Sequence, residues 1–63
     1  MTQKELLYLE DAIGHERIII SSIESFIDEL QNPTLIDYMN QELKTHQKML
    51  KNTLKLMEDN TNE

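Results

Sequence analysis

The segment Gln31-Asn32-Pro33-Thr34 ("QNPT", residues 31–34) is the strong break in this chain, and it decides the fold. Asn32 can cap a helix, and Pro33 suits the first helical position, where its missing N–H would have no partner anyway. A residue that precedes proline disfavours the helical conformation, so Gln31 and Asn32 end the preceding element. We therefore expect one helix on each side of a turn at residues 31–33.

The segment before the break has the apolar pattern of one long helix, from about residue 3 to about residue 30. Thr2 and Glu5 have the spacing of a capping box. Steps of three and four residues then select Leu6, Leu9, Ile13, Glu16, Ile20, Ile23, Ile27 and Leu30. Seven of these eight side chains are apolar, which is typical of a helix that packs along a seam. Over this length the pattern outweighs Gly14 and the isoleucines 18–20, which disfavour helix locally.

The segment after the break predicts a second helix, from Pro33 to about Met57, followed by a frayed acidic tail at residues 58–63. Its corresponding positions are Ile36, Met39, Leu43, His46, Leu50, Leu54 and Met57. A connection this short forces the two helices to lie antiparallel. The polar exceptions of the two helices, Glu16 and His46, should then meet. The predicted fold is all-α, a single two-helix hairpin over residues 1–63.

Composition narrows the classes of function. The 63 residues lack cysteine, so the chain has no disulfide. Its net charge of −6 argues against nucleic acid or an anionic membrane as partner. No apolar run is long enough to span a bilayer, and the first residues lack the basic and apolar regions of a signal peptide. We expect a cytoplasmic protein.

The apolar residues beside the two seams indicate that a lone hairpin is incomplete. The isoleucines 18–20 cover more of the first helix than one neighbouring helix can bury. Both helices carry more apolar residues than the seam between them can cover. The expected interface residues are Ala12, Ile18, Ile19, Phe26, Leu35, Met49 and Leu56. We predict a homodimer in which two hairpins form an antiparallel four-helix bundle. The alternative is a third helix donated by another protein.

Three residues are candidates for metal binding: Glu16, Glu42 and His46. Carboxylates and imidazoles that point into a four-helix bundle hold metals in ferritin-like proteins, but that pattern uses Glu-x-x-His spacing, whereas Glu42 and His46 are four apart. We therefore favour a structural hydrogen bond between Glu16 and His46 that fixes the register of the hairpin. We expect no cofactor and no catalytic residues, because the chain has no paired nucleophile and base, no phosphate-binding loop and no zinc motif.

The chain carries four lysines in its second half, at positions 44, 48, 51 and 55, and most of its carboxylates in the first half. In an antiparallel hairpin we expect these lysines to face the early acidic segment. A solvated lysine face is the simpler interpretation of most of this pattern.

Residues 9–57 resemble the spore coat protein F family of endospore-forming bacteria, a branch of the ferritin-like superfamily. The resemblance lies in the Leu-rich acidic opening from Leu9 to Glu16, in the linker Asn32-Pro33-Thr34-Leu35, and in Glu42, His46 and Met57 of the second helix. It implies a ferritin-like hairpin without established catalysis, made in sporulating cells, deposited in the spore coat and associated with other coat or sporulation proteins. The tail "EDNTNE" departs from the aromatic and glycine tail of that family, so a small cytoplasmic relative is the other expectation.

A second resemblance concerns "NQELK", residues 40–44. It is similar to the Ser-Gln-Glu-Leu-Asp motif of the small sporulation-regulator phosphatases, which are also short helical hairpins and act on a response regulator. Gln41, Glu42 and Leu43 match, whereas Asn40 and Lys44 replace the outer residues. This resemblance implies a phosphatase-like hairpin as one alternative function, and a ferritin-like metal-binding dimer is another.

Overall fold

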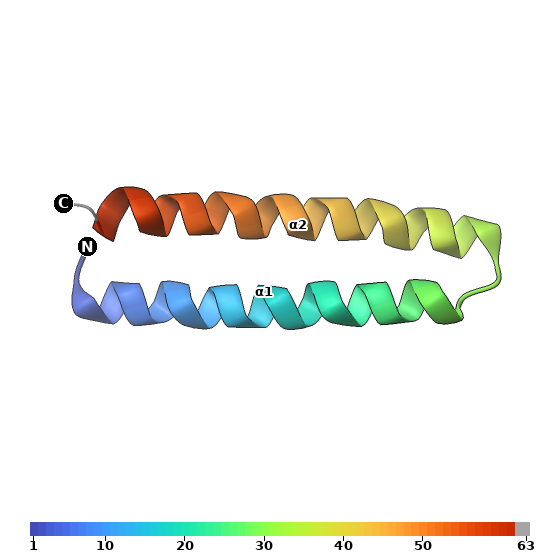
Figure 1. Cartoon of the computed structure of the whole chain (residues 1–63), viewed down its shortest axis with the longest axis horizontal. Helices are drawn as coiled ribbons and strands as arrows, with labels where there is room; N and C mark the ends of the chain where they lie inside the picture. The colour runs from blue at the N-terminus through green and yellow to red at the C-terminus, as the bar shows by residue number, and fades with distance from the viewer. Residues whose placement is uncertain (62–63) are drawn as a thin grey trace.

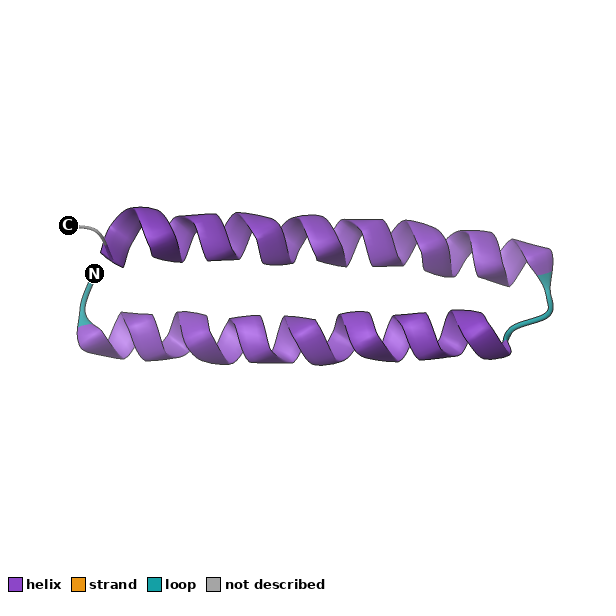
Figure 2. Ribbon diagram, viewed as in Figure 1, coloured by secondary structure: helices purple, strands orange, loops and turns teal. Residues whose placement is uncertain are grey.

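The computed structural model describes residues 1–61 and contains two helices, α1 (Gln3–Glu29) and α2 (Pro33–Thr61). Figure 1 shows them side by side and antiparallel, with the start of α1 and the end of α2 at the same end of the molecule. Figure 2 shows a single loop between the helices. The predicted all-helical hairpin is confirmed, with its turn at residues 30–32.

Hydrogen bonds at the start of each helix explain where the helices begin. The Thr2 side chain accepts from the Glu5 backbone N–H (3.1 Å), and the Thr2 backbone N–H donates to the Glu5 carboxylate (2.8 Å), which completes the predicted capping box. Hydrogen bonding to the Glu5 carboxylate, first from the Thr2 backbone N–H and then from the Thr2 side chain, lowers the pKa of Glu5 because it favours the charged form. At α2, the Asn32 side chain accepts from the backbone N–H groups of Thr34 (2.9 Å) and Leu35 (3.2 Å).

The predicted seam is the line along which the helices pack. All fifteen positions selected by the three- and four-residue steps are buried or partly buried, including the polar pair Glu16 and His46, whereas most of their neighbours are exposed. Only Ile13 and Ile23 are more than nine-tenths buried among residues 1–61, at 8% and 6% exposure. The hairpin therefore has a seam but little interior.

The end of α2 differs from the prediction. The helix continues to Thr61 rather than ending near Met57, so residues 58–61 of the predicted frayed tail are helical, and residues 62–63 lie outside the described residues. No glycine or proline occurs after Met57 to stop the helix. The Asn60 side chain donates to the Leu56 carbonyl oxygen (2.8 Å), a bond made one turn back along the helix.

The molecule is elongated rather than compact. Its Cα radius of gyration is 14.6 Å and its extents are 47 × 15 × 11 Å. A compact domain of this length would have a radius of gyration of about 11 Å. The hairpin is thus one layer of two helices, open to solvent on both faces.

Candidate functional site

The polar pair at the centre of the hairpin is the first candidate site. Glu16 of α1 and His46 of α2 meet through a carboxylate oxygen, Oε1, and the ring nitrogen Nδ1, as the seam pattern predicted. The side chains are largely covered, with 14% of Glu16 and 21% of His46 exposed. A direct bond between the two polar groups of the seam satisfies both of them and fixes which residues of the two helices lie opposite each other.

Glu42 lies on the other side of the same imidazole. Its Oε2 is 3.7 Å from His46 Nε2, across one turn of α2, and its side chain is 38% exposed. Because Glu16 and Glu42 approach different ring nitrogens, their oxygens lie at opposite ends of the ring. Within residues 1–61, no group of three His, Asp or Glu side chains has the arrangement of a metal site. The three candidates form a chain of polar contacts rather than a converging set of ligands.

The segment that is similar to a phosphatase motif is divided among three environments. Gln41 is exposed, Glu42 contacts His46, and Leu43 lies on the seam. Neighbouring residues of a helix are rotated by about 100°, so these side chains leave the helix in different directions. His15, next to Glu16, is exposed.

Large exposed apolar side chains form a second candidate site. Rotation of about 100° per residue places Tyr8, Ala12, Ile19 and Phe26 in one stripe, about 80° from the seam of α1. A similar stripe lies beside the seam of α2, displaced in the same rotational sense. Because the helices are antiparallel, both stripes fall on the same side of the hairpin. This apolar face consists of Tyr8, Ala12, Ile19, Phe26, Leu35, Tyr38, Met49 and Leu56.

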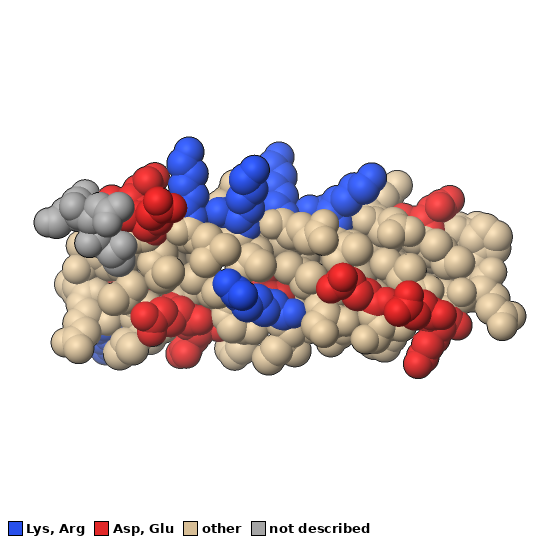
Figure 3. All heavy atoms as spheres, in the orientation of Figure 1, with Lys and Arg blue, Asp and Glu red and all other residues tan. Residues whose placement is uncertain are grey.

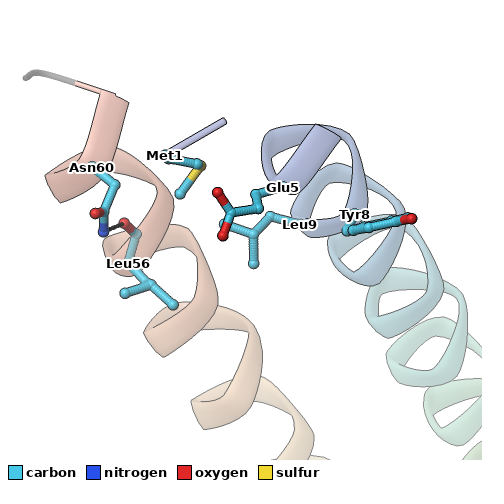
Figure 4. Close-up of a pocket in the computed structure, with 6 residues that line it drawn as sticks. All are labelled: Met1, Glu5, Tyr8, Leu9, Leu56 and Asn60. Carbon is cyan, nitrogen blue, oxygen red and sulfur yellow. Dashed lines mark hydrogen bonds between the residues drawn. The ribbon is translucent and has the colours of Figure 1, made fainter. Parts of the chain in front are cut away.

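A pocket at the open end of the hairpin is bordered by one residue of each stripe. Tyr8 and Leu56, one from each stripe, line it together with Met1, Glu5, Leu9 and Asn60. Figure 4 shows Glu5 and Leu9 on α1 and, across the gap, Leu56 and Asn60 on α2. Both helices therefore contribute apolar residues to one pocket at this end.

The opposite side of the hairpin is polar, and the outer side of α1 is separate from both faces. Rotation from the seam places Glu10, Arg17, Glu24, Asp28, Asn40, Gln47 and Lys51 on the polar face, all of them exposed.

Ile18, predicted as an interface residue, lies on the outer side of α1, opposite the seam, and is 64% exposed. Leu7 lies on that outer side too. The other six predicted interface residues belong to the apolar face.

The four lysines of α2 do not face α1 as expected. All are exposed, and within residues 1–61 none of them lies within ion-pair distance of a carboxylate of α1. Figure 3 shows the basic side chains of α2 along its outer border, with acidic side chains over α1 and toward both ends of the molecule. The seam is occupied by apolar residues, so the lysines rotate away from it into solvent.

No protein-family model matches the chain, and neither a curated protein nor a solved structure matches it. Among the described residues, neither helix has an apolar stretch of the length needed to cross a membrane.

Proposed function

We propose that the protein is a non-catalytic structural or assembly unit that self-associates through its apolar face. Two hairpins stack these faces together and form a homodimeric, antiparallel four-helix bundle. The observation that carries this proposal is that eight residues of the two helices, six of them large apolar side chains more than 45% exposed, lie on one side of a hairpin whose other side is polar.

The burial pattern supports a partner for this face. A chain of 63 residues in one layer buries few side chains completely, and small helical proteins commonly gain the missing burial by oligomerising. Stacking two hairpins would remove Ile19, Phe26 and Met49 from water. It would also cover the partly exposed side of the seam, including Glu42 beside His46.

The size of the face is suited to a stable dimer. The Cα extents of 47 and 15 Å give a face of roughly 700 Å², close to the area of about 800 Å² per partner that stable interfaces bury. The same face on both copies makes the contact isologous, which closes with two subunits.

Two adjacent isoleucines of α1 provide a matched experiment. Ile19 lies on the apolar face and Ile18 on the outer side of the same helix, and both are exposed within the hairpin. We expect Ile19→Lys to abolish the dimer, because it buries a charge at the interface, and Ile18→Lys to leave it intact. Sedimentation equilibrium of each variant and of the original chain measures the association constant.

Circular dichroism of the same samples separates association from folding. Loss of the dimer in Ile19→Lys alone, with helix content retained, supports the proposal. A monomeric original chain, or equal effects of the two substitutions, would refute it.

The resemblance to spore coat F proteins extends the proposal to the place where the unit acts. We propose that the dimer forms in the cytoplasm of a sporulating cell and is deposited in the spore coat with other coat proteins. Its support is the match over Leu9 to Glu16, the linker Asn32-Pro33, and the second-helix residues Glu42, His46 and Met57. Immunoblots of purified coat extracts against sporulating-cell cytosol test it, and absence from the coat throughout sporulation would contradict deposition.

A further inference from the structure

The four lysines of α2 form a single row. Their spacing of four, three and four residues places them within an arc of about 60°, over about 16 Å of helix. No acidic residue occurs between Leu43 and Met57 to neutralise them along the chain. We name this row the lysine edge: Lys44, Lys48, Lys51 and Lys55.

Helix α1 has the opposite charge. It contains seven acidic residues against Lys4 and Arg17, and five of the seven lie exposed on its outer and polar sides. We name these five the acidic edge: Glu10, Asp11, Glu24, Asp28 and Glu29. Arg17 interrupts this edge, so its uninterrupted part is the loop end from Glu24 to Glu29.

The carboxylates at this loop end are not explained by the stability of α1 itself. Negative charge is unfavourable near the C-terminus of a helix, where the unpaired carbonyl groups already carry partial negative charge. Asp28 and Glu29 lie in the last turn of α1, which contains no basic residue. Neither of them has a cation of α2 within ion-pair distance. The hairpin itself therefore provides no ion-pair partner on α2 for these two charges.

We propose that the lysine edge of one hairpin binds the acidic edge of another copy, so that the protein assembles side by side beyond the dimer. The two edges lie along the two long sides of the hairpin and leave the apolar face uncovered. A contact between two different edges of the same chain is heterologous, so it continues from copy to copy rather than closing with two. The inference goes beyond the proposed dimer and does not depend on it.

Charge supports a second copy as the occupant of the lysine edge. A net charge of −6 repels the chain as a whole from phosphate-rich surfaces and from a second copy alike, so the contact depends on local complementarity. Helix α1 of another copy offers this complementarity, because it presents carboxylates along a helix of nearly the same length as α2. Single exposed ion pairs contribute little, so the contact depends on several pairs together and on low ionic strength.

Charge reversal on both edges tests the contact directly. One variant carries Lys48→Glu and Lys51→Glu, and the other carries Asp28→Lys and Glu29→Lys. In the first variant the lysine edge has no net charge, and in the second the acidic edge carries cations at positions 28 and 29. An equal mixture brings the intact acidic edge of the first variant together with the intact lysine edge of the second. All four positions are exposed, and circular dichroism of each variant checks that the hairpin is folded.

Sedimentation velocity at about 20 mM and about 300 mM salt provides the measurement. We expect the original chain to form species larger than a dimer at low salt only, each variant alone to form none, and the mixture to regain them. Absence of salt-dependent species in the original chain, or a mixture that behaves like its components, would overturn the proposal. So would lysine-dependent binding to vesicles of anionic phospholipid without any larger species.

The same experiment separates this proposal from that of the dimer. Contact through the apolar face is insensitive to charge reversal at the edges and weakens in Ile19→Lys, whereas contact through the edges weakens with salt. In Ile19→Lys, salt-dependent growth should therefore still occur, starting from the monomer.

Discussion

Gly14→Ala should stabilise the protein, although Gly14 lies in a stretch that looks like a helix break. Gly14 is in the interior of α1 with an ordinary helical backbone, because no glycine among the described residues has a positive φ. A Cβ atom added at this position would have no atom outside the local helix backbone within 4 Å. The native conformation therefore suits alanine without strain, and the substitution acts mainly by reducing the freedom of the unfolded chain.

The expected magnitude follows from this setting. Alanine is more favourable than glycine in a helix interior by about 1 kcal/mol, and nothing at Gly14 opposes the gain. For a domain of this size the gain corresponds to an increase of roughly 4–8 °C in the Tm. Gly14 lies between the outer side and the polar face of α1, so the association constant should not change.

Urea unfolding, followed by circular dichroism at one fixed protein concentration, measures the effect. Ser25→Ala is the matched control, because Ser25 is also exposed and lies on the same side of α1. Its gain in the free energy of unfolding should be smaller, about 0.5 kcal/mol, since the helix propensity of serine is closer to that of alanine than the helix propensity of glycine is. An unchanged or lower free energy of unfolding in Gly14→Ala would refute the interpretation of this segment as an unstrained helix.

Two further predictions concern polar residues. Replacing either Glu16 or His46 by leucine should destabilise the hairpin by about 1–3 kcal/mol, because the remaining residue loses its seam partner. The double replacement should recover most of this loss. Urea unfolding of the two single variants and the double variant measures the coupling, and additive losses would contradict the prediction. Stability should also fall in acid through Glu5. Its pKa is lower in the folded chain than the ordinary value of 4.5, so its contribution is present above that value and is lost as pH falls through the folded pKa. Urea midpoints measured between about pH 6 and pH 3 should show a smaller decrease in Glu5→Gln, and identical profiles would argue against the capping box as a source of acid sensitivity.

The helices and their packing seam could be predicted from the sequence because both depend on local information. Proline at a first helical position, a capping asparagine and a capping box fix where helices begin, and a repeat of three and four residues fixes which side is covered. The predicted end of α2 near Met57 was wrong, because it also relied on local composition. An acidic, polar composition predicted fraying after Met57, but nothing in residues 58–61 breaks a helix.

The candidate site was predicted in part. The contact between Glu16 and His46 followed from two polar exceptions at matching places in an antiparallel pair, and it is confirmed. The opposite positions of Glu16 and Glu42 around the imidazole depend on side-chain conformations, which spacing alone does not specify. The placement of Ile19 on the apolar face and of Ile18 on the outer side likewise depends on the rotation of α1 about its own axis.

The sequence by itself determined two helices, the turn between them and the line along which they pack. Only the tertiary structure decided what lies on each remaining side. Once the seams fix the rotation of both helices, the two apolar stripes fall on one face and the lysines of α2 point outward rather than toward α1. The physical reason is that burial of the seam dominates the packing, so the positions of charges and surplus apolar residues follow from it.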